Sequence, residues 1–223
     1  MTLVADPDDI RLSDRPLIVS DIDDVVLQFI DPFNLYLESL GHRHLPRSFR
    51  LHGNIVSIAD GSVLDDARVS ALIQDFYRLQ HDWQRPFETA CETLQSLAKA
   101  ADIVFLTAMP PVYAATRRAL LDRFGLTFPM IATETAKGPV VERLHGGRDQ
   151  PVVFLDDMAR NLASVAERVP ECLLIHLKPP AAVFAFAPPA GDGVVPARDW
   201  AEAEAIIRSH FHLRQARCQP EKN

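Results

Sequence analysis

The sequence has few cysteines, no long apolar run and no excess of positive charge. Its three cysteines, Cys91, Cys172 and Cys218, show no paired spacing in a chain of 223 residues. An odd count without an export signal predicts reduced thiols rather than a disulfide framework. Cys91 and Cys172 stand among apolar residues with no basic neighbour to activate a thiolate, which favours a place in the core over a catalytic role.

Composition also argues against a membrane or nucleic-acid partner. No apolar run is long enough to cross a bilayer, and the opening stretch MTLVADPDDIRLSD lacks the basic and apolar regions of a secretory signal. The formal net charge of −7 argues against a domain-wide nucleic-acid surface. We therefore expect a cytoplasmic protein that acts as a monomer or a homodimer, with neither a membrane nor a nucleic acid as partner.

Five short apolar runs predict the strands of the fold. Because they are almost continuously apolar, they are typical of parallel strands covered by helices on both faces. The runs are residues 17–20, 103–106, 128–132, 152–155 and 172–177. Helices predicted at 87–100, 113–124 and 158–168 alternate with them, which indicates an α/β fold with a three-layer, Rossmann-like parallel sheet. Residues 178–196, rich in Pro and Ala, are expected to be irregular before a helix at 199–211.

One long segment after the first strand breaks this alternation. Helical patterns at residues 32–40 and 65–79 are joined by a polar segment without a clear buried strand. We interpret the segment as a small helical cap of residues 28–84, inserted into an α/β core formed by residues 1–27 and 85–223.

Acidic residues crowd the end of the first predicted strand. Asp21, Asp23 and Asp24 follow it directly, and ligands of open parallel sheets bind beyond the carboxyl ends of the strands. Two carboxylates 4 Å apart repel by about 4 kcal/mol at an effective dielectric constant of about 20, so a cation is expected beside them. The alternative is an ordinary acidic helix start, which three carboxylates in such a short stretch argue against.

A second acidic pair, Asp156 and Asp157, ends the fourth predicted strand, and Asn161 follows after about one helical turn. A hard cation with oxygen ligands would neutralise carboxylates from two strand ends, and room for waters and a phosphate oxygen favours Mg²⁺. Asp157 can instead cap the following helix, and the residues alone leave both roles open.

Thr107 and Lys137 follow the second and third predicted strands. The Thr107 hydroxyl and nearby backbone N–H groups can hold a phosphoryl oxygen, and the Lys137 ammonium can offset the charge of a nucleophile and a phosphate. Taken singly, Thr107 is a turn cap and Lys137 a solvated surface residue. Their place at the ends of successive strands favours the functional interpretation.

In the order of these motifs the sequence resembles the haloacid dehalogenase-like (HAD-like) hydrolase superfamily. The family has Asp-x-Asp after strand one, Ser or Thr after strand two, a Lys, and an acidic pair after strand four. The resemblance implies the phosphatase branch, because the dehalogenases lack the second Asp. It also implies a helical C1-type cap. By this resemblance Asp21 is the nucleophile and Asp23 the general acid/base. Thr107 and Lys137 take part in catalysis and in phosphate binding, and Ala108 in phosphate binding. The implied Mg²⁺ ligands are Asp21, Asp156, Asp157 and the backbone carbonyl of Asp23.

The expected reaction is hydrolysis of a small phosphorylated metabolite through an aspartyl phosphate on Asp21. A phosphotransferase or phosphomutase of the same family differs only in the fate of that intermediate and stays open. A receiver-type switch or a silent phosphate-binding protein is a weaker alternative, since Lys137 precedes Asp156 and the cap is present. Relatives often have Asn where this chain has Ala108, which bears on substrate contacts more than on the reaction.

Two groups in or next to the cap have no assigned role: the basic run 41–52, and Tyr77, His81, Trp83 and Arg85 near the point where the chain leaves the cap. The basic run can grip an anionic leaving group or form a solvated loop. The second group can line a pocket or pack the cap on the core.

Overall fold

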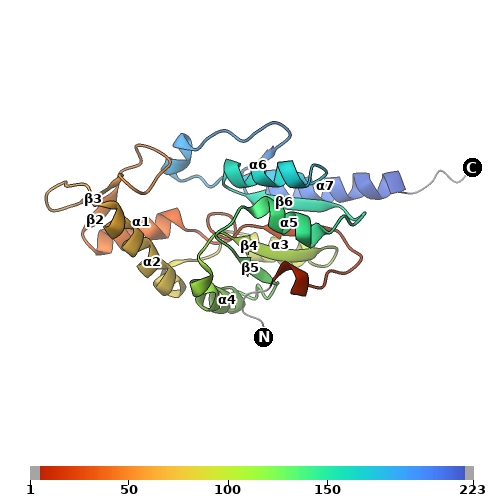
Figure 1. The fold of residues 1–223 in the computed structure, drawn as a ribbon, viewed down its shortest axis with the longest axis horizontal. Helices are drawn as coiled ribbons and strands as arrows, with labels where there is room; N and C mark the ends of the chain where they lie inside the picture. The colour runs from red at the N-terminus through yellow and green to blue at the C-terminus, as the bar shows by residue number, and fades with distance from the viewer. Residues whose placement is uncertain (1–5, 219–223) are drawn as a thin grey trace, which may run out of the picture.

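A computed structural model describes residues 6–218; residues 1–5 and 219–223, including the first residues of the opening stretch, lie outside it. Its centre is a six-stranded sheet in the order β5-β4-β1-β6-β7-β8, in which all neighbouring strands are parallel (Figure 1). The strands are β1 (Leu17–Ser20), β4 (Asp102–Thr107), β5 (Met130–Ala132), β6 (Val152–Asp156), β7 (Leu173–Leu177) and β8 (Val195–Ala197).

Helices cover both faces of this sheet, as the continuous apolar runs predicted. Ile18 belongs to the core cluster that includes α3 (Ala90–Leu97), α4 (Ala114–Arg123) and α7 (Trp200–Cys218). Its neighbours Leu17 and Val19 belong to the cluster formed with α5 (Lys137–His145) and α6 (Ala159–Arg168). Successive strand side chains point to opposite faces, so a strand buried on both sides must be apolar throughout.

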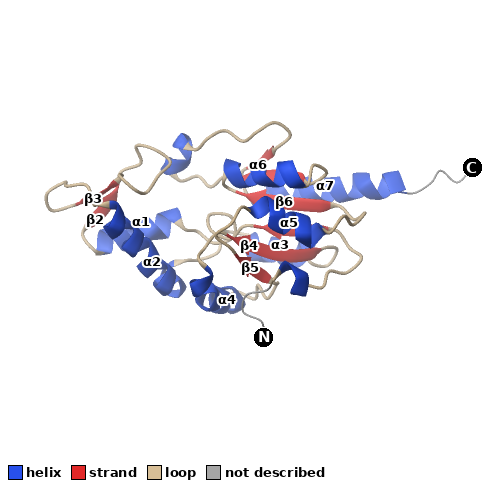
Figure 2. Cartoon of the chain, in the orientation of Figure 1, coloured by secondary structure: helices blue, strands red, loops and turns tan. Residues whose placement is uncertain are grey.

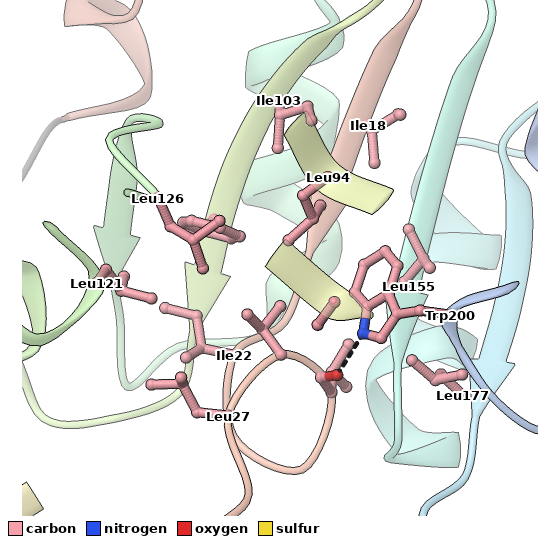
Figure 3. Close-up of a cluster of buried hydrophobic side chains, with 14 of the residues drawn as sticks. Ile18, Ile22, Leu27, Leu94, Ile103, Leu121, Leu126, Leu155, Leu177 and Trp200 are labelled. Atoms are coloured by element: carbon pink, nitrogen blue, oxygen red, sulfur yellow. Dashed lines mark hydrogen bonds between the residues drawn. The ribbon is translucent and has the colours of Figure 1, made fainter. Parts of the chain in front are cut away.

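Trp200 ties the last helix to the loop that follows β1. Its indole lies against Leu155 and Leu177, and its Nε1 donates a hydrogen bond of 2.8 Å to the backbone carbonyl of Val25 (Figure 3). Trp200 is 1% exposed, so this bond satisfies a polar group that burial would otherwise leave unpaired.

All five predicted strands are present, but the tail and two helices differ from expectation. Residues 178–196 were expected to be irregular, yet they contain the 3₁₀ helix η3 (Ala182–Phe186) and lead into the edge strand β8. Pro196 is tolerated in β8 because an edge strand can leave one side without ladder bonds. Helix α5 was not predicted. Helix α3 begins at Ala90 rather than at 87 because Thr89 before it has a φ of 63°.

The insertion after β1 contains two helices, α1 (Ile30–Ser39) and α2 (Asp66–Trp83) (Figure 2). Its polar connector, predicted to lack strands, forms an antiparallel hairpin of β2 (His42–His44) and β3 (Ile55–Ser57). The hairpin gives only a short signal in the sequence because three residues of each strand are paired. The insertion also has its own apolar cluster; the exact boundaries at 28 and 84 stay a prediction.

The two described cysteine side chains are free thiols in apolar surroundings, as predicted. Burial raises the pKa of Cys172 above its ordinary value, which keeps that thiol protonated. The side chain of Cys218 lies outside the described part of the chain. Among residues 6–218, no helix has the length and apolar content needed to cross a membrane.

Candidate active site

The loop after β1 connects the sheet directly to the insertion. The backbone N–H of Asp21 donates to the carbonyl of Leu155 on β6, which continues the β1–β6 ladder by one residue. Asp24 adopts a φ of 56°, and its carboxylate accepts the N–H groups of Phe29 and Ile30 where α1 begins. Burial raises the pKa of Asp24 to about 7. Asp24 therefore caps the first cap helix, while Asp21 stays at the end of the strand.

Lys137 bridges the two acidic strand ends. As the first residue of α5, it places Nζ 2.5 Å from Asp21 Oδ1 and 2.7 Å from Asp156 Oδ2, and its side chain is 1% exposed. Burial alone would lower the pKa of Lys137, but the carboxylates of Asp156 and Asp21 raise it above its ordinary value. The ammonium is therefore charged and offsets part of the negative charge that burial concentrates here.

Asp156 is fully engaged by the protein. Besides Lys137, it accepts the backbone N–H of Met158 at 2.8 Å and the side-chain amide of Asn161 at 3.0 Å. Both of its oxygens therefore have donors. Asp156, rather than Asp157, carries the hydrogen bond at the start of α6, so the predicted alternative of Asp157 as a helix cap is wrong.

Asp157 is the buried carboxylate without a partner. Within the described residues no hydrogen bond reaches its side chain, and only its backbone carbonyl is bonded, to His176 Nε2 at 2.8 Å. Burial, followed by the charges of Asp156 and Asp21, raises the pKa of Asp157 well above its ordinary value. Although Lys137 lies close by, the protein supplies no positively charged partner to the buried carboxylate of Asp157 itself.

A divalent cation fits this arrangement. Oxygen atoms from Asp21, Asp156 and Asp157 all lie within 4.8 Å of one another. Because Asp156 is already occupied by donors, the free carboxylate of Asp157 and the second oxygen of Asp21 are the best placed direct ligands. Hard oxygen ligands of this kind suit Mg²⁺. The carboxylate of Asp23 is not part of the cluster, which leaves its backbone carbonyl as the predicted ligand.

Asp23 is held by a charged network that the sequence did not reveal. Arg117 Nη2 lies 2.8 Å from Asp23 Oδ1, and Gln84 Nε2 donates to the same oxygen at 2.9 Å. The Arg117 side chain is 0% exposed, and its Nε donates to Gln80 Oε1. Arg117 comes from α4 of the core, whereas Gln80 lies in α2 of the cap and Gln84 directly follows that helix. Side chains from both the core and the cap therefore fix the orientation of the Asp23 carboxylate.

Thr107 and Ala108 lie where β4 ends, as predicted. Thr107 is 1% exposed, and its Oγ1 accepts the N–H of Met109 at 3.2 Å, which fits the turn-capping role that any threonine can have there. Both residues also line a cavity together with Asp21 and Lys137. Their contact with a phosphoryl group stays a prediction.

This cavity, of about 340 Å³, lies between the acidic strand ends and the cap. The cap residues singled out from the sequence that line it are Phe49, Arg50, Leu51 and Tyr77. The rest of the basic run and His81, Trp83 and Arg85 do not; the Trp83 ring instead packs on Tyr36 within the cap. Of the basic run, only residues 49–51 therefore reach the site.

No family model and no curated protein match the sequence. Solved structures do match it along most of its length. A haloacid dehalogenase-like family hydrolase from Xanthomonas campestris matches with a TM-score of 0.56 and 14% identity, over 91% of this chain and 98% of that one. A haloacid dehalogenase-like family hydrolase from Streptococcus pneumoniae matches with a TM-score of 0.54 and 13% identity, over 89% and 99%.

A third structure, described as a predicted phosphoglycolate phosphatase from Haemophilus somnus, has a TM-score of 0.54 and 13% identity, over 87% of this chain and 99% of that one. The chain has the haloacid dehalogenase-like fold. The predicted fold is thereby confirmed, including a cap inserted after the first strand. In this HAD-like core all four predicted motifs lie at the carboxyl edge of the sheet and border one cavity.

Proposed function

We propose that the chain is a Mg²⁺-dependent phosphohydrolase that cleaves a small phosphorylated metabolite through an aspartyl phosphate on Asp21. The observation that carries the proposal is the buried cluster of Asp21, Lys137 Nζ, Asp156 and the unpartnered Asp157 at the floor of a cavity. A site that concentrates carboxylates beside one ammonium is suited to a cation and a phosphate together. The HAD-like fold agrees with this proposal by analogy.

Mg²⁺ would be held by Asp21, Asp157 and the backbone carbonyl of Asp23. When bound, it supplies positive charge against the phosphoryl oxygens as the transition state forms. Lys137 contributes a second positive charge from the protein. Burial raises the pKa of Asp21 to about 7, and Lys137 acts against that rise, so the ammonium helps to keep the nucleophile ionised.

Asp21 can attack phosphorus because one of its oxygens, Oδ1, is fixed by Lys137 while the carboxylate borders the cavity. Asp23 also borders the cavity and is oriented by Arg117 and Gln84. In the first step Asp23 gives a proton to the departing ester oxygen. In the second it takes a proton from the water that releases phosphate from Asp21.

The test is phosphate release from a panel of phosphate monoesters, with and without Mg²⁺. Asp21→Asn is expected to lower kcat at least about 10³-fold because it removes the nucleophile. Asp23→Asn is expected to lower it about 10²- to 10⁴-fold, the usual range for a general acid/base. The exposed Asp149, changed to Asn, serves as the matched control and keeps full activity.

Activity that survives in Asp21→Asn, or that does not depend on a divalent cation, would overturn the proposal. Mass spectrometry of the wild type after incubation with substrate separates the remaining cases. A phosphorylated Asp21 without phosphate release indicates transfer to another acceptor instead of hydrolysis.

A further inference from the structure

The wall opposite the acidic floor of the cavity is apolar. Of the side chains that line the cavity from the cap and from η3, only those of Arg50 and Tyr77 carry a polar group. Burial raises the pKa of Tyr77 above its ordinary value, so its hydroxyl stays neutral. The floor can therefore bind charge, whereas the side chains of the opposite wall offer a polar group only the Arg50 guanidinium and the Tyr77 hydroxyl.

Aromatic rings form much of this wall, in two pairs from different parts of the chain. Phe29 and Tyr77, both from the cap, have ring centroids 5.7 Å apart. Phe49 of the cap loop and Phe184 of η3 have centroids 5.4 Å apart. Phe184 is 3% exposed and belongs to a small apolar cluster with Ile30. The loop between β2 and β3 and the tail after β7 thus line the cavity together.

This wall is poorly matched to a sugar or polyol. Each hydroxyl buried there needs a hydrogen-bond partner, and a hydroxyl without one weakens binding. A planar ring, in contrast, can stack on or pack edge-on against the phenylalanines and loses no hydrogen bond on leaving water. The cavity of about 340 Å³ is also near the lower end of the range for small-molecule sites, so the organic part must be compact.

We propose that the site selects phosphate monoesters whose alcohol part carries a compact aromatic ring, with the ring held between Phe49, Phe184, Phe29 and Tyr77. This inference rests on the proposed function. As the Asp21–phosphorus bond forms, the ester P–O bond breaks and the departing alkoxide takes a proton from Asp23. Water then breaks the Asp21–phosphorus bond, returns a proton to Asp23 and leaves inorganic phosphate.

The experiment compares two esters of primary alcohols, so that leaving-group chemistry differs little. We expect kcat/KM of the wild type with Mg²⁺ to be at least about tenfold higher for 2-phenylethyl phosphate than for glycerol 1-phosphate. With 2-cyclohexylethyl phosphate, which is apolar but not planar, kcat/KM should lie between the two, because it buries apolar area without aromatic packing.

Phe184→Leu and Phe49→Leu keep apolar volume but remove a ring. Each is expected to lower kcat/KM for 2-phenylethyl phosphate about three- to tenfold, mainly by raising KM, with a smaller change for glycerol 1-phosphate. Phe186 is the matched control, since it lies in the same short helix but is 50% exposed and does not line the cavity. Phe186→Leu keeps the wild-type preference. Thermal unfolding of each variant verifies that it is folded.

Binding of a phosphonate that cannot be hydrolysed separates this inference from the proposed function. Calorimetry with Mg²⁺ should give tighter binding of phenylphosphonate than of methylphosphonate, and Phe184→Leu should reduce the difference. If this holds while no ester is hydrolysed, the wall is confirmed and only the proposed function fails. If esters are hydrolysed but glycerol 1-phosphate is equal or better, the inference is wrong and the hydrolase remains. Equal phosphonate affinities without hydrolysis would overturn both.

Discussion

Replacing Lys137 by methionine removes the cation that lies between Asp21 and Asp156. Methionine has a similar length and fills the space with a flexible apolar chain, so the change removes charge more than volume. Asp156 is 0% exposed and Asp21 is 5% exposed, so little water is available to compensate for the lost ammonium. Removing one partner of a buried ion pair typically costs about 3–5 kcal/mol. We expect the free energy of unfolding to fall by that amount at pH 8.

The loss should depend on pH in a defined direction. Burial raises the pKa of Asp21 to about 7, and Lys137 works against this rise. Without Lys137 the pKa of Asp21 rises further, so between pH 7 and that higher pKa the folded variant binds a proton that neither the folded wild type nor the unfolded chain, with an ordinary pKa near 3.9, holds. Proton uptake by the folded variant stabilises it as the pH falls through this range. The stability difference between wild type and variant is therefore largest above the raised pKa of the variant, shrinks as the pH falls toward 7, and stays at the smaller value down to pH 5.5, where both folded proteins are protonated at Asp21.

Urea unfolding at pH 8 and pH 5.5 in the presence of a chelator measures both effects. In thermal unfolding, where 1 kcal/mol shifts the melting temperature of a chain of this size by about 2–4 °C, the melting temperature at pH 8 should fall by about 6–20 °C. Lys99→Met, at an exposed site, is the control and should stay within about 0.5 kcal/mol of the wild type. A loss below about 1 kcal/mol, or an equal loss at both pH values, would refute the reasoning.

Three further changes follow from other contacts. Arg117→Met should lower the free energy of unfolding by about 2–4 kcal/mol, because Asp23 loses its buried partner. The same change should lower kcat more than it raises KM, and an unchanged kcat would contradict this. Asp102→Asn should cost about 1–2 kcal/mol at pH 7. Although burial raises it, the pairing with Arg15 holds the pKa of Asp102 below its ordinary value. This cost is therefore complete above about pH 5 and is lost progressively as the pH falls below about 4, through the lowered pKa; denaturant unfolding across that range checks it. Gly138→Ala would put a methyl group 2.0 Å from a backbone oxygen of α6 and should cost at least about 1–3 kcal/mol in thermal unfolding.

The sheet could be predicted where both of its faces are buried. Leu17, Ile18 and Val19 alternate between the two core clusters, so the run is apolar at every position and stands out in the sequence. The edge strand β8 lacks this signal because Val195 and Pro196 are partly or fully exposed. The cap hairpin escaped prediction because it pairs only three residues of each strand and because β2, His42–His44, contains no apolar residue.

The carboxylates at the strand ends could also be predicted, because parallel topology brings the ends of β1 and β6 to one edge of the sheet. Which of these carboxylates has which contacts could not be predicted. Asp156 and Asp157 are adjacent and chemically identical, and only the direction of each side chain decides which one meets Lys137 and which one stays free. That direction follows from Asp156 being the last residue of the strand, a boundary that the sequence defines only to within a residue or two.

Arg117 marks the limit of such reasoning. It lies in the segment Thr116-Arg117-Arg118 of an otherwise ordinary amphipathic helix, where a charged residue is normally solvated. In its buried position its Nε and Nη2 donate to Asp23, 94 residues away in the sequence, and to two glutamines, Gln80 of α2 and Gln84 directly after it. None of these partners is local, so no pattern of spacing identifies them. Since two of the three come from the cap, the environment of Asp23 is complete only when the cap rests on the core, and any movement of the cap changes the hydrogen bonds of the proposed proton donor.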